Sequence, residues 1–111
     1  MVIDFDKYPV VAKPNFKGGN KEYLVQTFED GDNRIMHGRL EPGASIGLHL
    51  HEENSEIYYI LKGQAELIYD DGRETVLSGQ AHYCPVGHSH SLMNNGNEEL
   101  EFIAIVSWHN K

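Results

Sequence analysis

His49 and His51, separated by a single residue, are the pair of side chains in this sequence best placed to bind one metal ion together. Side chains alternate between the two faces of a β-strand, so both imidazoles would point the same way on an extended segment. Glu56 follows a few residues later, and His90 lies in a separate region of the chain. Three neutral imidazoles and one carboxylate suit a divalent transition metal better than calcium or an iron–sulfur cluster.

The residues around these four candidates form two ordered motifs. Residues 43–63 fit the pattern G-x5-H-x-H-x4-E-x6-G, and residues 79–94 fit the pattern G-x5-P-x-G-x2-H-x3-N, both without a mismatch. A spacer of 15 residues, 64–78, separates the two motifs. In these motifs, their order and their spacing, the chain resembles the cupin superfamily, and the resemblance covers the middle half of the sequence.

The resemblance implies both a fold and a metal site. The fold would be all-β, a cupin jelly-roll or double-stranded β-helix barrel, similar to the small monocupins of the cupin-2 conserved-barrel type. Inside the barrel the family would hold one divalent transition metal ion, with Mn, Fe, Ni, Co and Zn as candidates. The ligands implied for it are His49, His51, Glu56 and His90. Four protein ligands on an octahedral ion leave two positions for a small-molecule ligand or substrate.

The family contains dioxygenases, isomerases, epimerases, lyases, decarboxylases and plain ligand binders, and the fold does not select among them. Our first hypothesis is a metal-dependent enzyme acting on a small oxygen-rich metabolite, of isomerase, dioxygenase or lyase type. The alternative is a non-catalytic, metal-dependent binding or sensor protein. A proton-transfer group near the ligand would separate the two, and only two candidates are visible. Tyr58 shares a strand face with Glu56, and His88 lies two residues before His90.

Length and composition limit the remaining possibilities. A chain of 111 residues is expected to form one domain, 1–111, with an N-terminal arm over 1–20 and a barrel over 21–111. Its net charge of −8 and lack of basic clusters argue against a nucleic-acid partner. No apolar run is long enough for a membrane span, so no membrane partner is expected. Cys84 is the single cysteine and no secretory signal is visible, which predicts a cytoplasmic protein.

Turn signals divide the sequence into short β-rich runs. Residues 30–33 and 70–72 are typical of hairpin connections, because Gly and Asn adopt positive φ angles readily. The Pro-Gly segments at 42–43 and 85–87 should break strands, and we expect the chain to cross between sheets there. The runs expected to be strands are 22–29, 34–40, 64–69, 73–77 and 100–106.

The lining of the barrel cavity depends on the register of residues 34–40. Two faces alternate along this segment: Met36, Gly38 and Leu40 on one, and Ile35, His37 and Arg39 on the other. The interpretation we favour turns the first face inward and suits a small, partly apolar molecule; the lining would then be Met36, Leu40, Tyr58, Ile60 and Leu92. With the opposite register, Arg39 could clamp a carboxylate or a phosphate.

Residues 1–20 mix apolar side chains with prolines, which favours an extended, irregular arm. The arm could cap one end of its own barrel or pack on a partner subunit, and both arrangements stay open. Ile57, Tyr59 and Leu61 are out of phase with Glu56, so an outer sheet face is apolar. Because monomers rarely expose a contiguous apolar patch, we expect a homodimer.

Overall fold

Antiparallel strands make up most of residues 1–109, the part of the chain that this computed structural model describes. No helix in that range is long and apolar enough to cross a membrane. In chain order the elements are η1 (Phe5–Lys7), β1 (Val11–Pro14), η2 (Phe16–Gly18), β2 (Glu22–Glu29), β3 (Asn33–Leu40), β4 (Ser45–Leu50), β5 (Asn54–Lys62), β6 (Gln64–Tyr69), β7 (Gly72–Leu77), β8 (Ala81–Cys84), β9 (Ser89–Met93) and β10 (Leu100–Trp108).

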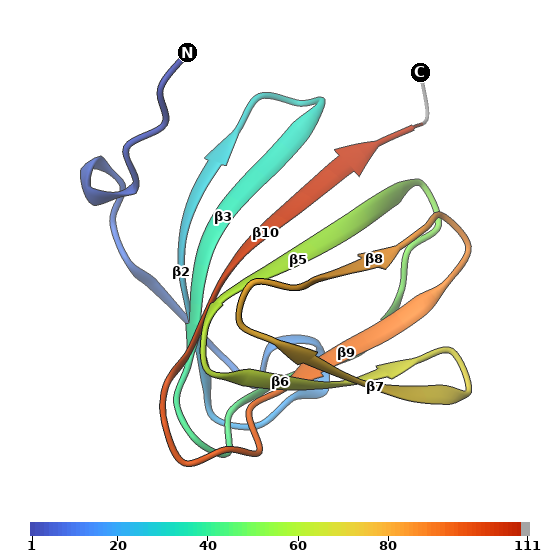
Figure 1. Cartoon of the computed structure of the whole chain (residues 1–111). Helices are drawn as coiled ribbons and strands as arrows, with labels where there is room; N and C mark the ends of the chain where they lie inside the picture. The colour runs from blue at the N-terminus through green and yellow to red at the C-terminus, as the bar shows by residue number, and fades with distance from the viewer. Residues whose placement is uncertain (110–111) are drawn as a thin grey trace.

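The strands form two antiparallel sheets that share one core (Figure 1). The larger sheet has six strands in the order β1-β2-β3-β10-β5-β8, and the smaller has four in the order β4-β9-β6-β7. The all-β fold expected from the sequence is therefore confirmed. The chain crosses between sheets from β3 to β4 and from β8 to β9, where the Pro-Gly segments at 42–43 and 85–87 lie.

The two predicted turns join neighbouring strands of one sheet. Between β2 and β3, Gly31 adopts a φ of +90°, and the Asp30 carboxylate accepts a hydrogen bond from the Asn33 N–H at 2.9 Å. Between β6 and β7 it is Asp70 that takes the left-handed conformation, with a φ of +51°. Asp and Asn tolerate this region better than other residues with a side chain. The five predicted strands end within two residues of the observed ends.

Alternating side chains of the strands fill the core between the sheets. On β10 every second residue from 100 to 106 is buried, and the residues between them are partly exposed. Gly38 on β3 leaves room for two aromatic rings, because an added Cβ would collide with both Tyr23 and Phe102. These two rings stack with centroids 5.8 Å apart. Each large apolar side chain buried in this way contributes about 1.5–3 kcal/mol, so the stability of the barrel rests mainly on residues outside the metal site.

The N-terminal arm pairs with its own chain. β1 extends the larger sheet by pairing antiparallel to β2, with Val11 opposite Val25 and Pro14 opposite Glu22. After β1, the side chain of Phe16 packs against the core. Of the two arrangements that the sequence left open, the described chain adopts the one in which the arm covers its own barrel.

A close contact between two glycines holds the arm against β4. A Cβ on Gly19 would collide with the Ser45 carbonyl, and a Cβ on Gly47 would collide with the Lys17 carbonyl. We call Gly19, Gly47 and the backbone that each of them faces the glycine seam. Lys17 itself has a φ of +56°, in the left-handed region that lysine seldom occupies. The seam thus fixes a strained turn of the arm beside the strand that carries His49.

Candidate metal centre

Elements from both sheets bring the four candidate ligands together. His49 on β4 stands opposite His90 on β9, just after an irregularity in the ladder between these strands. Glu56 comes from β5, in the larger sheet. His51 follows the end of β4, and its backbone N–H donates to the carbonyl of His88 at 3.0 Å. Strand alternation and this backbone contact together turn all four side chains toward the inside of the barrel.

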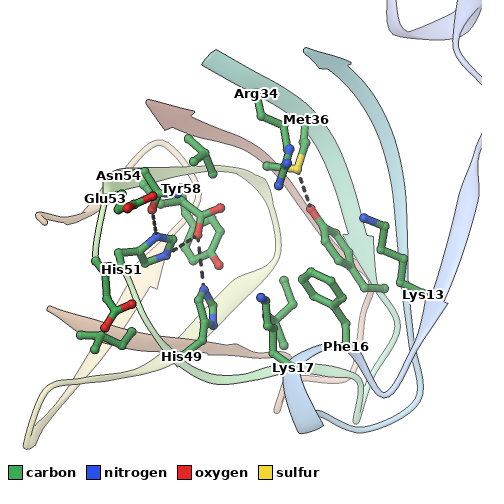
Figure 2. A pocket seen from close by; sticks show the side chains of 16 residues that line it. Lys13, Phe16, Lys17, Arg34, Met36, His49, His51, Glu53, Asn54 and Tyr58 are labelled. Carbon is green, nitrogen blue, oxygen red and sulfur yellow. Dashed lines mark hydrogen bonds and ion pairs between the residues drawn. The ribbon is translucent and has the colours of Figure 1, made fainter. Parts of the chain in front are cut away.

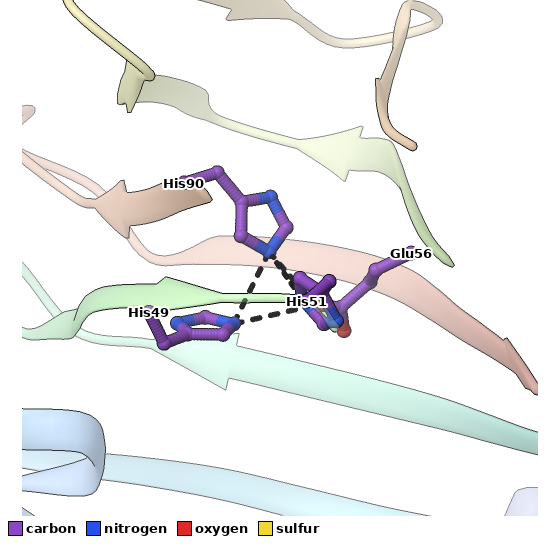
Figure 3. Close-up of side chains that lie close together, drawn as sticks. All are labelled: His49, His51, Glu56 and His90. Atoms are coloured by element: carbon purple, nitrogen blue, oxygen red, sulfur yellow. Dashed lines mark hydrogen bonds and ion pairs between the residues drawn. The ribbon is translucent and has the colours of Figure 1, made fainter. Parts of the chain in front are cut away.

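The imidazole Nε2 atoms and the Glu56 carboxylate converge on one point (Figure 3). His90 Nε2 lies 2.9 Å from His51 Nε2 and 3.2 Å from His49 Nε2. It also lies 3.0 Å from Oε1 of Glu56. That oxygen is 3.2 Å from His51 Nε2 and 3.7 Å from His49 Nε2. The four side chains are between 0% and 14% exposed, so the cluster is almost fully enclosed.

These spacings suit a bound cation better than a hydrogen-bond network. Nitrogen and oxygen ligands lie about 2.0–2.2 Å from a transition metal, so two ligands at right angles are about 3 Å apart. Four of the five measured separations are 2.9–3.2 Å. A single proton on His90 Nε2 could serve only one of its three neighbours, whereas one cation satisfies all of them. The structure therefore positions these four residues as a candidate metal site.

The electrostatics of the cluster keep Glu56 ionised. Burial by itself would raise the pKa of this carboxyl, but hydrogen bonds to the three histidines outweigh burial and hold the pKa well below its ordinary value. Burial lowers the pKa of His90, which favours its neutral form. Burial also lowers the pKa of His51, but hydrogen bonds to Glu56 and Asn54 outweigh burial, so the pKa of His51 is raised. The cluster is thus a buried carboxylate among imidazoles, an arrangement that a cation stabilises.

The ring nitrogens that face away from the centre are also occupied. His49 Nδ1 donates to a backbone carbonyl of β4 at 2.8 Å, and His51 Nδ1 donates to the side-chain oxygen of Asn54. His90 Nδ1 lies 3.1 Å from Nε2 of His82. Contacts of this kind orient the ligands of metal sites. All three rings are therefore held with Nε2 toward the shared point.

The sequence did not identify Asn54 or His82 as part of the site. His82 had a usable signal, since alternation along β8 places it on the same inward face as Cys84, and both are buried. Asn54 had the same kind of signal, since it is the first residue of β5 and alternation places it on the same face as Glu56.

The two catalytic candidates lie in different surroundings. Tyr58 is buried at the cluster, and its ring stacks on that of His90 with centroids 5.0 Å apart. Burial and the charge of Glu56 raise the pKa of Tyr58 well above its ordinary value, so the phenol stays protonated. His88 has a side chain that is 43% exposed, and its Nδ1 lies 2.6 Å from the Asp70 carboxylate. The structure brings Tyr58 to the metal site and leaves His88 outside the pocket described next.

A pocket of about 270 Å³ opens onto the cluster from one side (Figure 2). His49, His51 and Glu56 form part of its lining, together with Met36 from β3 and Tyr58 from β5. Three of the four candidate ligands therefore face a space that a small molecule can enter.

The inward face of β3 is the apolar one, as the favoured register predicted. Met36 and Tyr58 line the pocket, but the prediction for Leu40, Ile60 and Leu92 is wrong. These three side chains are fully buried in the core, because their strands continue beyond the cluster into the closed part of the barrel.

Three cationic side chains, Lys13, Lys17 and Arg34, line the same pocket, and we call them the cationic rim. Figure 2 shows the two lysines on the arm and Arg34 on β3, with Glu53 on the opposite side beside His51. Burial and the nearby charges of Arg34 and Lys17 lower the pKa of Lys13, which reflects how close the three cations lie. The open side of the metal site is therefore positively charged along one wall.

The sequence analysis did not predict the cationic rim. Arg34 could have been found, because it shares the inward face of β3 with Met36. The arm lysines could not, because the sequence left open which barrel the arm covers. Glu29 offsets part of the charge of Arg34 through an ion pair at 2.7 Å.

Comparison with known proteins agrees with this geometry. A family model described as a cupin domain matches residues 36–106. The chain belongs to the cupin family. Its two antiparallel sheets are accordingly the double-stranded β-helix of cupins, as the resemblance implied.

Two curated cupin relatives differ in how much of their length they share with this chain. An oxalate-binding protein from Thermotoga maritima is 44% identical over 101 residues, which cover 83% of this chain and 81% of that protein. The alginate biosynthesis protein AlgA of Pseudomonas putida is 31% identical over 77 residues. Those residues cover 69% of this chain but 16% of AlgA, so this cupin corresponds to a small part of that protein.

Two solved structures resemble this cupin closely. One is a crystal structure from Thermotoga maritima described as a predicted oxalate decarboxylase, with a TM-score of 0.90 and 31% identity over 97% of this chain and 99% of that one. The other is an uncharacterized protein with a double-stranded β-helix domain from Klebsiella pneumoniae. Its TM-score is 0.78 at 22% identity, covering 98% of this chain and 90% of that one, and this likeness concerns the fold alone.

Proposed function

We propose that this cupin binds a small dicarboxylate anion of the oxalate class through one divalent transition metal ion. The residues that would hold the ion are His49, His51, Glu56 and His90. A metal bound there would supply Lewis acidity and two open positions for a pair of carboxylate oxygens. The observation that carries the proposal is the position of the cationic rim, which lines the same pocket as three of these ligands.

The charge and size of the pocket favour an anion with few atoms. Hydrogen bonds from cations to carboxylates contribute about 1.5–3 kcal/mol each, so the rim discriminates against neutral sugars of similar size. A volume of about 270 Å³ lies at the lower end for small-molecule sites. The side chains of Phe16 and Met36 add apolar surface to the lining, which limits access of water to the bound anion.

The named relatives support the same class of ligand. The Thermotoga protein that is 44% identical over most of both chains is called oxalate-binding, and the structure with the TM-score of 0.90 is called a predicted oxalate decarboxylase. Both names concern one small dicarboxylate, which is a ligand that the cationic rim and the metal ligands of this cupin could hold between them.

Binding without turnover is the form of this proposal that the two catalytic candidates from the sequence favour. Turnover requires a group that exchanges a proton with the ligand, and the sequence offered Tyr58 and His88. The raised pKa of Tyr58 keeps its phenol protonated, so it can donate a hydrogen bond but cannot act as a base. His88 is paired with Asp70 and does not line the pocket. Catalysis of an isomerase, dioxygenase or lyase type remains the alternative that the experiment must address.

Calorimetry on the metal-free and the Mn²⁺-loaded protein tests the proposal. Oxalate should bind the loaded protein and not the metal-free one, while acetate and a neutral sugar should bind weakly or not at all. Formate and carbon dioxide should not accumulate on incubation with oxalate, and their release at a steady rate would establish the enzyme instead. Failure of the loaded protein to bind oxalate would refute the proposal.

Two arginines on β3 provide a matched pair of variants for the same measurement. Arg34→Gln should weaken oxalate binding about tenfold or more through loss of a charged contact. Arg39→Gln should leave binding unchanged, because Arg39 lies on the opposite face of the strand. Equal loss in the two variants would mean that Arg34 acts through the overall charge of the protein.

We further propose that the protein is a homodimer that uses the outer face of the larger sheet. Ile35, Ile105, Ile57 and Tyr83 lie side by side across β3, β10, β5 and β8. Ile57 and Tyr83 are 38% and 56% exposed in the single chain, which leaves a row of apolar side chains in contact with water. Sedimentation should give twice the chain mass of 12.6 kDa, and Ile57→Lys should reduce it to that mass. A wild-type mass of 12.6 kDa would refute the dimer.

A further inference from the structure

Two buried hydrogen bonds link His90 to a carboxylate at the protein surface. His90 Nδ1 lies 3.1 Å from His82 Nε2, and His82 Nδ1 lies 2.7 Å from Oε1 of Glu74. The side chain of His82 is 1% exposed, while that of Glu74 on β7 is 43% exposed. Neither residue lines the pocket. The link therefore reaches the metal site from the side opposite to the one a ligand would enter.

The carboxylate at the end of this link sets the direction of both hydrogen bonds. An ionised carboxylate only accepts, so His82 Nδ1 must donate to Glu74. A neutral imidazole has one donor and one acceptor, so His82 Nε2 then accepts from His90 Nδ1. With its proton on Nδ1, His90 presents an unprotonated Nε2 to the centre of the cluster, which is the form that binds a metal.

Aromatic neighbours restrict both rings. Tyr58 stacks on His90 with an interplanar angle of 10°, and its centroid lies 6.1 Å from that of His82. Tyr69 packs edge-on against His82 at 5.2 Å and 83°. Both imidazoles are buried among these rings, and the hydrogen bonds from His90 to His82 and from His82 to Glu74 define how each ring is oriented.

We propose that Glu74 and His82 are positioning residues that orient His90 and accept its Nδ1 proton when a metal is bound at its Nε2. The inference rests on the metal site of the proposed function. His49 and His51 donate from Nδ1 to oxygen atoms that can only accept. His90 has an imidazole in that place, and an imidazole could accept or donate. Glu74 removes this ambiguity.

Nitrogen-15 NMR of the histidine rings in the protein loaded with diamagnetic Zn²⁺ tests the tautomers directly. Both His82 and His90 should carry their proton on Nδ1, and His82 should carry none on Nε2. A proton on Nε2 of His82, or a doubly protonated His82, would overturn the inference. In Glu74→Ala the Nδ1 proton of His82 loses its acceptor, so the two tautomers of His82 should appear as a mixture, and an unchanged spectrum would count against the role of Glu74.

Metal affinity gives a second readout, measured as Mn²⁺ competition with a chelator. His82→Phe removes the acceptor for His90 and should weaken Mn²⁺ binding about 10–100-fold, the usual loss when such an outer contact of a metal ligand is removed. His82→Gln keeps a carbonyl acceptor and should retain more affinity than the Phe variant. If His82→Phe fails to fold, the Gln variant and Glu74→Ala carry the comparison, and wild-type affinity in both would overturn the inference.

His37 provides the matched control, since it pairs with a carboxylate in the same way but lies on the face of β3 opposite to Met36, outside the pocket. Its Nε2 lies 2.6 Å from Glu101, and His37→Phe should leave Mn²⁺ affinity unchanged. Absence of oxalate binding by the metal-loaded wild type would refute the proposed function, while the Mn²⁺ affinities of the variants would still decide this inference. If a folded His82→Phe variant bound Mn²⁺ as tightly as the wild type, this inference would be overturned and the proposed function would stand.

Discussion

The two sides of the candidate metal site are built in different ways. On the inner side, a regular strand of the barrel presents His82, whose ring packs against His90. On the pocket side, two lysines come from an arm whose turn contains left-handed residues and is held by the glycine seam. The inner side is closed and fully hydrogen-bonded, and the pocket side is open and charged.

This difference separates two tasks that a metal-dependent binding site must combine. The inner side restricts the orientation of the ligands, so it should determine how tightly the metal is held. The pocket side touches the entering molecule, so it should determine which anion is accepted. Variants on the two sides are therefore expected to change different measured quantities.

The largest effect is expected from removal of a ligand. His51→Ala should reduce metal affinity by more than about 100-fold, beyond the usual loss from an outer contact. The barrel should stay folded, because the core consists of other residues. Metal analysis measures the metal content and circular dichroism measures the fold. His88→Ala, at an exposed position, is the control. Normal metal content would contradict the ligand set, and unfolding would mean that the metal is structural.

Gly19→Ala should act on the pocket side alone. The added Cβ would collide with the Ser45 carbonyl, so the arm must move away from β4 or the barrel must distort, at about 1–3 kcal/mol of stability. With the arm displaced, oxalate affinity should fall by at least tenfold, about the effect of losing one charged contact, while Mn²⁺ affinity changes little. Gly72→Ala is the control, since its Cβ would make only an ordinary contact. Equal loss of metal and anion affinity would show that the two sides are not independent.

Lys17 in the arm and Lys21 just after it allow the charge to be tested without moving the backbone. Lys17 and Lys21 have φ angles of +56° and +57°, but only Lys17 lines the pocket. Lys17→Gln should weaken oxalate binding about tenfold, and Lys21→Gln should leave it unchanged. Calorimetry on the metal-loaded variants measures the difference. A comparable loss in both would assign the effect to the strained turn instead of the charge.

The smallest effect concerns pH. Because the folded metal-free protein raises the pKa of His51 above about 6.5, this imidazole keeps a proton that the metal must displace. Metal affinity should therefore rise with pH through that window, by at most about tenfold per pH unit, and level off above it. In the metal-free protein the same group stabilises the fold fully below pH 6.5, and this stabilisation is lost as the pH rises through the raised pKa. Competition titrations between pH 6 and 8 measure the slope, and a flat profile would contradict the shift.

The sequence predicted the site residues on the strands better than those on the arm, for a physical reason. Period-two alternation determines where a side chain points once a strand is recognised, so His49, Glu56 and Tyr58 could be placed from the sequence. The same rule would have placed His82 and Arg34 on inward faces. The partner of His82 could not be found in this way, because Glu74 reaches it from a different strand.

The arm followed no such rule. Its placement depends on backbone contacts between Gly19, Gly47 and distant carbonyls, and the identity of a glycine does not reveal which carbonyl it will approach. Lys17 lies in a left-handed turn, so strand periodicity says nothing about its direction. The cavity lining was misassigned for a related reason, since alternation gives the face of Leu40 and Ile60 but not their depth in the barrel.

The glycine seam also bears on how such a protein could change over time. The segment that supplies two of the three rim cations precedes β2, and the metal ligands and their supporting contacts lie between residues 47 and 90. Recombination near residue 20 could exchange one selectivity element for another without altering a metal ligand, provided that both glycines are retained. A library of chimaeric arms on this barrel would therefore sample anion preference while every member inherited the same metal chemistry.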